Sequence, residues 1–356
     1  MKIIDSVLAG PNKVCLNFNG GSIGEDVELL LYALKESYAG SIGLDTSDFE
    51  ELLNQVSLLR EEKDKETLYV LLKEVFSKVK DNHLKIWRTH AERSIGSVSQ
   101  KSYEVGRNVA DEEEVVVRTI EEESYTLIGL SHFPMPNSNL WKTFLKDIEL
   151  SLENSNFAII DFRGNGGGND YFGYKMAELF YDQKFFHPIN SQLVLNTALV
   201  KLIQSNTFYK RNEEYFDKFR TDFYGFKAES DRVLKHNDGA GVTQLDGKSY
   251  NKPIYVLIDR DCKSSGESTA LCFEDHPQVQ YVGQASNGCI EFGNVGIIVL
   301  PYSKLCIQLS THKNIFRDNR NFEKIGIRPH IKCESGQDAL DVAVQDYRNK
   351  KAPAKN

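Results

Sequence analysis

Hydrophobic positions near the start of the chain recur at helical spacing. Leu29, Leu30 and Ala33 lie on one face of a helix, and the apolar positions of residues 68–79 follow the same period. This pattern predicts a small helical subdomain over residues 1–84.

Several later apolar runs are too short for helices. Residues 157–161 (FAIID) and 254–259 (IYVLID) are typical of buried central strands, and residues 125–133 (YTLIGLSHF) also predict a strand. Residues 140–152 carry apolar side chains at helical spacing, and a further helix is expected at residues 267–273. Alternating strands and helices indicate an α/β fold with a layered β-sheet core and flanking helices.

The remaining segments differ from this alternation. Residues 183–250 are polar, aromatic and poorly periodic, and we interpret them as an insertion or lid. Residues 295–311 alternate as a β-hairpin does, with its turn at 301–304. The sequence thus predicts an α/β core over residues 85–335, with a C-terminal helix and tail over residues 336–356.

Composition narrows the function classes. The 356 residues are 40% hydrophobic and 26% charged, as in a folded enzyme, and the net charge of -8 disfavours nucleic-acid binding. No apolar run reaches the roughly 20 residues that cross a bilayer, and the start lacks the apolar segment of a secretory signal. We therefore expect no membrane partner and a cytoplasmic location.

The cysteines and histidines give no metal signature. The six cysteines include no CxxC pair, which indicates reduced thiols rather than a disulfide framework. No Cys or His spacing resembles a zinc site. We therefore predict neither a metal nor another cofactor.

A glycine-rich loop, residues 163–169 (RGNGGGN), directly follows the first buried strand. A dinucleotide fingerprint would need glycine at Asn169, and a phosphate-binding P-loop would need a Gly-Lys-Ser/Thr sequence that is absent. Two interpretations remain open. The glycine N–H groups could stabilise an oxyanion, or the loop could be a tight turn without chemistry.

Ser264 lies between the second buried strand and the following helix. A hydroxyl there is close to unpaired helix N–H groups, which suits a nucleophile whose oxyanion must be stabilised. However, Ser264 and Glu267 also match the spacing of a capping box, which would make the serine purely structural.

These motifs together resemble one known family. Residues 159–168 (IIDFRGNGGG) are similar to the D-x-R-G-N-x-G-G motif of the tail-specific (C-terminal-processing) and tricorn-core serine peptidases. Residues 253–259 with 264–267 (SSGE) resemble that family's nucleophile segment. Two later segments, residues 282–284 (VGQ) and 326–331 (GIRPHI), follow in the family's order. The resemblance covers residues 125–335 and implies a ClpP/crotonase-like core with Ser264 as nucleophile.

The resemblance also separates two branches of the family. In the processing peptidases a lysine about 25 residues after the serine is the base, but here that count reaches Cys289. The tricorn-like branch uses a histidine before the core, and residues 81–83 (DNH) resemble its motif. The interval between His83 and Tyr125 is too short for the PDZ domain of the processing peptidases. We therefore predict a tricorn-like member without a PDZ domain.

The same resemblance implies the other site residues. His83 would be the general base and Glu323 would orient its imidazole, while Asn82 occupies the position of the family's orienting serine. The backbone N–H groups of Gly167 and Ser265 would hold the oxyanion.

The leading prediction is a serine peptidase that hydrolyses peptides or unfolded proteins through an acyl-enzyme on Ser264. An alternative is a catalytically inactive member that binds a peptide or another ligand, because Cys289 replaces the lysine and Asn82 replaces the serine. An esterase or amidase would use the same acyl-transfer chemistry. The sequence does not indicate which oligomeric state the protein has.

Overall fold

The computed structural model describes residues 21–88, 115–121, 124–131, 133, 139–196, 232–237, 241–247, 249–317 and 319–351. The chain forms two compact units, which are described separately. Unit 1 comprises Met1–Val98, Asn190–Gly239 and Glu291–Ile315, and unit 2 comprises Ser99–Ile189, Ala240–Ile290 and Phe316–Asn356. None of the described helices is long and apolar enough to span a membrane.

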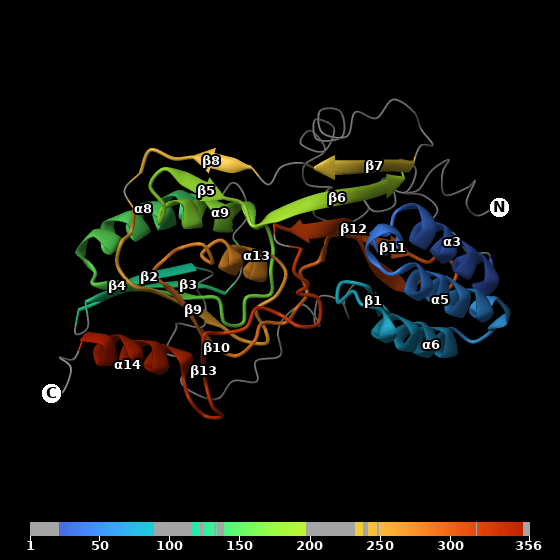
Figure 1. Ribbon diagram of the computed structural model, residues 1–356. Coiled ribbons are helices and arrows are strands. Elements are labelled where there is room, and N and C mark those ends of the chain that lie inside the picture. Colours follow the sequence, from blue (N-terminus) through green and yellow to red (C-terminus); the bar gives the residue numbers. More distant parts are fainter. Residues whose placement is uncertain are drawn as a thin grey trace. The chain divides into compact units, whose positions relative to one another are not determined.

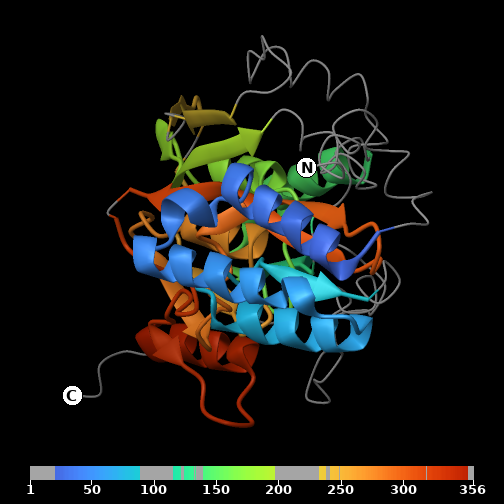
Figure 2. The same cartoon turned by 90° about the vertical axis from the view of Figure 1, so that its right-hand side faces the viewer.

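The first part of unit 1 is helical, as the apolar spacing predicts. Its elements are α3 (Ile23–Glu36), α4 (Gly40–Gly43), α5 (Thr46–Ser57), the 3-10 helix η1 (Leu58–Glu61) and α6 (Lys65–Lys78). Ser22 begins α3 with a capping box, in which its Oγ accepts from Glu25 N–H at 3.3 Å. Figure 2 shows α3, α5 and α6 as blue coils lying side by side.

An antiparallel hairpin completes the apolar core of unit 1. It joins β11 (Phe292–Val299) to β12 (Cys306–Phe316), with Val299 opposite Cys306, so the turn predicted at residues 301–304 is confirmed. The sheet order is β1 (Lys85–Trp87), β12, β6 (Ile189–Asn196) and β7 (Arg232–Asn237), with β11 on β12. Ile298, Ile307 and Leu309 pack against the buried faces of the helices.

Unit 2 is built on a six-stranded sheet. Its order is β13 (Ile331–Lys332), β10 (Val279–Gly283), β9 (Ile254–Ile258), β4 (Phe157–Asp161), β3 (Tyr125–Leu130) and β2 (Val115–Ile120). All neighbours are parallel except β2, which is antiparallel to β3. Every residue of β4 and β9 is buried, which explains why both read as continuous apolar runs.

Helices cover both faces of this sheet, so the predicted layered α/β fold is confirmed. Figure 1 shows α14 (Ala339–Lys351) on one face and α8 (Asn139–Asn154), α9 (Tyr171–Glu178) and α13 (Ser265–Leu271) on the other. The two faces carry separate apolar clusters, one around Ile160 and Val256 and one around Phe157. Helices on both faces keep the central strands dry and rigid.

The segment of residues 183–250 contains more regular structure than its sequence indicates. Besides β6 and β7 it includes β5 (Lys184–Phe186), which pairs antiparallel with β8 (Val242–Gln244). The absence of strand signals in this segment was therefore misleading. Residues 197–231 lie outside the described residues, so the lid and the domain boundaries stay predictions.

Candidate active site

Two turns at the same edge of the unit 2 sheet form the candidate site. Strands β4 and β9 are parallel neighbours, with Asp161 opposite Leu257, so their carboxyl ends lie together. The glycine loop, here residues 162–170, follows β4 and leads into α9. The nucleophile turn, residues 259–264, follows β9 and leads into α13. The fold therefore brings Ser264 beside the glycine loop.

Three hydrogen bonds hold these turns together. Gly164 N–H donates to Asp259 Oδ1 at 3.0 Å, and Lys263 N–H donates to Asn165 O at 2.9 Å. Ser265 Oγ donates to Gly168 O at 2.8 Å. Because two of these bonds join the glycine loop to the nucleophile turn and the third joins it to the first residue of α13, a shift of the glycine loop would be transmitted to Ser264.

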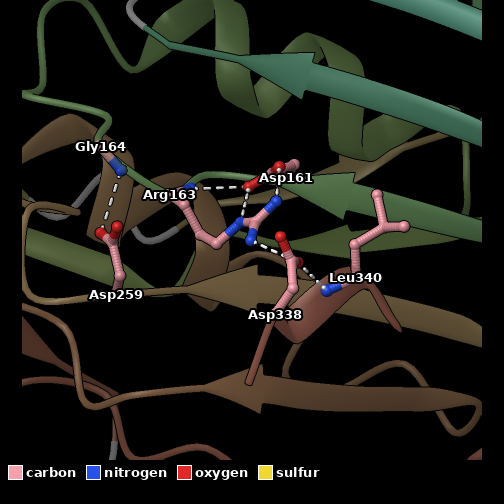
Figure 3. A network of polar contacts seen from close by, with 6 residues as sticks. All are labelled: Asp161, Arg163, Gly164, Asp259, Asp338 and Leu340. Carbon is pink, nitrogen blue, oxygen red and sulfur yellow. Dashed lines mark hydrogen bonds and ion pairs between the residues drawn. The ribbon is translucent and has the colours of Figure 1, made fainter. Parts of the chain in front are cut away.

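Arg163 anchors the start of the glycine loop, as Figure 3 shows. Its guanidinium group binds both carboxylate oxygens of Asp161, at 2.9 and 2.7 Å, and Asp338 Oδ1 at 2.8 Å. Asp338 also accepts Leu340 N–H at 2.8 Å. Burial alone would lower the pKa of Arg163, but Asp161 and Asp338 outweigh it and raise the pKa above its ordinary value. The bidentate contact of this arginine with Asp161 and its bond to Asp338 fix the direction in which the loop leaves β4.

Ser264 has a strained backbone. Its φ of 54° and ψ of -122° lie in a region of backbone conformation that residues other than glycine rarely adopt, and such a conformation costs about 1–3 kcal/mol. Its N–H donates both to Cys289 O at 3.0 Å and to Glu267 Oε2 at 3.1 Å. These bonds stabilise the strained turn, which leaves Ser264 partly exposed at the start of α13.

Glu267 is the buried centre of this arrangement. Its side chain accepts four hydrogen bonds, from Ser264 N–H, Cys289 N–H, Gly288 N–H and Ser286 Oγ, at 3.1, 2.9, 2.7 and 2.6 Å. Burial raises the pKa of Glu267, whereas the four donors oppose that rise. The carboxylate thus ties the nucleophile turn to residues 286–289.

Gly167 approaches Ser264 more closely than any other residue type could. A β-carbon built on Gly167 would lie 2.9 Å from Ser264 Cβ and 3.4 Å from Ser264 Oγ, and its φ is +99°. Its N–H, predicted to bind the oxyanion, donates to Asn165 Oδ1 at 2.9 Å. Among the described residues, Ser265 N–H has no hydrogen-bond acceptor.

Glu323 lies in the same unit and is 3% exposed. Its Oε2 accepts Ile290 N–H at 3.1 Å, and the neighbouring Lys324 N–H donates to Gly288 O at 2.7 Å. Residues 286–290 are therefore bound by Glu267 at one end and Glu323 at the other. This loop connects the predicted nucleophile with the predicted orienting carboxylate.

His83 and Asn82 belong to unit 1, on the turn between α6 and β1. His83 is 8% exposed, its N–H donates to Asp81 Oδ1 at 2.7 Å, and its carbonyl accepts Gln308 Nε2 at 2.8 Å. Burial raises the pKa of Asp81 to about 6, although the bonds from His83 N–H and Tyr38 lower it. These contacts fix the backbone of His83, and its pairing with Ser264 stays a prediction.

A sequence model described as peptidase family S41 matches residues 124–333. The chain belongs to this family of serine peptidases. The match contains the glycine loop, the nucleophile turn and Glu323, so the family resemblance predicted from the motifs is confirmed.

The relatives of this S41 chain agree with that assignment. The nisin-resistance protein of Lactococcus lactis subsp. lactis is 28% identical over 193 residues, which cover 53% of this chain and about half, 51%, of that protein. A candidate peptidase from Parabacteroides merdae superposes with a TM-score of 0.59 at 13% identity, covering 94% of this chain and 100% of that one. Mature CPAF complexed with lactacystin gives a TM-score of 0.57 at 12% identity, covering 95% and 97%. At such identities the structures show a shared fold.

Two residues of the site were not singled out from the sequence. Asn165 is fully buried, and its amide donates to Leu130 O at 2.9 Å while its Oδ1 accepts Gly167 N–H. Glu267 was interpreted only as half of a capping box and as the last residue of the SSGE motif. Its spacing from Ser264 was the signal for both, because its other partners lie 19–22 residues further along the chain.

Proposed function

We propose that this chain hydrolyses peptide bonds through an acyl-enzyme on Ser264. The observation that carries the proposal is the strained, hydrogen-bonded backbone of Ser264 directly opposite the side-chain-free face of Gly167. Strain of this kind persists where surrounding contacts hold it, and it concentrates at reactive residues. A capping serine alone would need neither the positive φ nor the approach of a glycine.

In the proposed mechanism Ser264 Oγ attacks the substrate carbonyl carbon while His83 accepts the hydroxyl proton. The tetrahedral oxyanion is stabilised by Ser265 N–H at the start of α13. Gly167 N–H contributes if it turns from Asn165 Oδ1 toward the substrate. His83 then protonates the leaving amine, and a water molecule activated by the same imidazole releases the acid.

Glu323 has the orienting role in this proposal. A carboxylate beside an imidazole selects the tautomer that accepts the serine proton and stabilises the cation that results. Asn82 has the secondary role of an amide hydrogen-bonding partner for the imidazole. The tricorn-like arrangement requires no lysine. It is therefore compatible with Cys289, which stands where the other branch has its lysine.

The substrates we propose are peptides or unfolded proteins. The nisin-resistance protein gives one concrete candidate, because its name refers to the peptide nisin. We therefore include nisin with unstructured reporter peptides among the substrates to test.

The test combines labelling with hydrolysis. A fluorophosphonate probe should modify Ser264, as located by peptide mass spectrometry, and Ser264→Ala should abolish both labelling and hydrolysis, by at least about 10³-fold. Ser77→Ala is the control, since this serine of α6 is exposed and its hydroxyl donates to Glu74 O of the same helix at 2.7 Å. Unchanged hydrolysis in Ser264→Ala, or labelling elsewhere, would refute the proposal.

A further inference from the structure

The residue directly before the proposed nucleophile is a lysine whose backbone is fixed. Lys263 N–H donates to Asn165 O at 2.9 Å, and Lys263 O accepts Gly266 N–H at 3.0 Å. The side chain extends over the exposed Gly166, because a β-carbon built there would have Lys263 Cε as its nearest neighbour, at 3.8 Å. The long stem of Lys263 thus lies along the glycine loop beside Ser264.

The ammonium group of Lys263 has no hydrogen-bond or ion-pair partner among the described residues. Two other lysines of unit 2 are paired, Lys175 with Glu178 at 2.7 Å and Lys252 with Leu152 O at 3.1 Å. Lys263 is nevertheless half-buried. A positive charge held at a site without a protein counterion is available to a ligand.

Three nearby carboxylates are already satisfied by other groups. Asp259 Oδ1 accepts the N–H groups of Gly164, Asp261 and Cys262, each at 3.0 Å. Glu267 accepts four donors, and Asp161 binds Arg163. Lys263 therefore provides a positive charge, unpaired among the described residues, directly next to the proposed nucleophile.

We propose that Lys263 is a specificity-determining residue that binds a substrate carboxylate on a residue flanking the scissile bond. This inference rests on the proposed function, and it adds the chemical class of the preferred substrate. The carboxylate could belong to an acidic side chain or to the end of the substrate chain. A charge-assisted hydrogen bond to it favours such substrates by about tenfold in kcat/KM.

The experiment uses matched fluorogenic peptides that differ in one group. One pair has Asp or Asn next to the scissile bond, and a second pair has a free or an amidated C-terminus at that position. Each is hydrolysed by the wild type, by Lys263→Met and by Lys263→Arg. Lys332→Met on β13 is the control, because this lysine is exposed and lies in another part of unit 2.

The wild type should prefer one carboxylate peptide over its neutral partner by about tenfold, and Lys263→Met should abolish that preference while retaining hydrolysis of the neutral peptide. Lys263→Arg and Lys332→Met should retain the preference. The pair that responds identifies the source of the carboxylate. Equal ratios in the wild type and Lys263→Met, for both pairs, would overturn the inference. Lys263→Gln provides a second neutral variant if Lys263→Met unfolds.

A binding arm separates this inference from the proposed function. Fluorescence anisotropy measures the same peptides on Ser264→Ala, with and without Lys263→Met. If no peptide is hydrolysed by the wild type, the proposed function fails. The affinity ratio between carboxylate and neutral peptides then still decides the role of Lys263, and a ratio near one overturns it.

Discussion

Gly167→Ala should reduce the reactivity of Ser264 because the new methyl group overlaps it. The added carbon would lie 2.9 Å from Ser264 Cβ, whereas carbon atoms in contact are ordinarily about 3.5–4.0 Å apart. One of the two must therefore move by roughly 0.6–1 Å. Misplacement of a reacting group by about 1 Å costs on the order of 10²-fold in rate.

The stability of this variant should also fall, for two separable reasons. A φ of +99° costs alanine about 1–2 kcal/mol, and overpacking against Ser264 costs about 1–3 kcal/mol more. Gly336→Ala is a matched control in the same unit. Its φ is +85°, but a β-carbon there would meet no atom within 4 Å, so only the backbone cost applies.

Two measurements separate these contributions. Urea unfolding gives the free-energy change of each variant, and the rate constant for fluorophosphonate labelling gives the reactivity of Ser264. Gly336→Ala should lose stability but label at the wild-type rate, whereas Gly167→Ala should lose both. If Gly167→Ala labels within about threefold of Gly336→Ala, equivalent to less than 1 kcal/mol, the geometric argument is refuted.

Two further predictions follow from buried titratable groups. Glu267→Gln keeps the shape of the side chain but replaces one acceptor oxygen with an NH2 group, which would face two of the four donors that the carboxylate binds. We therefore expect a loss of about 2–4 kcal/mol in the free energy of urea unfolding and a corresponding loss of labelling, and wild-type stability would contradict this. Burial lowers the pKa of His312 to about 4, so its contribution to stability is present above its ordinary pKa of 6.5 and is lost as the pH falls through 4. The difference in unfolding free energy between the wild type and His312→Gln should therefore shrink by about 3 kcal/mol from pH 7 to 4. The raised pKa of Asp81 gives a pH dependence of the opposite sign, but Asp81 is present in both proteins and its effect cancels in the difference. A difference that is independent of pH would contradict this assignment.

The fold of unit 2 was largely predictable because its signals are local. All five residues of β4 and all five of β9 are buried. A short apolar run bounded by polar residues and glycines is compatible with few structures other than a central strand. The hairpin of β11 and β12 was predictable for the same reason, since its partners are close in sequence. Strands β5 to β8 were missed because their partners are distant, as with Leu195 opposite Val233.

The candidate site likewise contains residues that could be predicted from the sequence and residues that could not. The glycine loop and Ser264 follow buried strands directly, so their positions could be inferred from the strands. The role of Glu267 could not, because its partners Ser286 and Gly288 are brought to it only by the return of the chain after β10. The engagement of Gly167 N–H by Asn165 depends on a side-chain orientation that no sequence pattern specifies.

The ion pair between Arg163 and Asp338 joins two segments 175 positions apart. Asp338 stands immediately before α14, while Arg163 stands at the base of the loop that faces Ser264. Loss of the Asp338 carboxylate would therefore leave the buried Arg163 guanidinium with Asp161 as its carboxylate partner. The segment just before the C-terminal helix thus helps to set the position of the loop beside the proposed nucleophile.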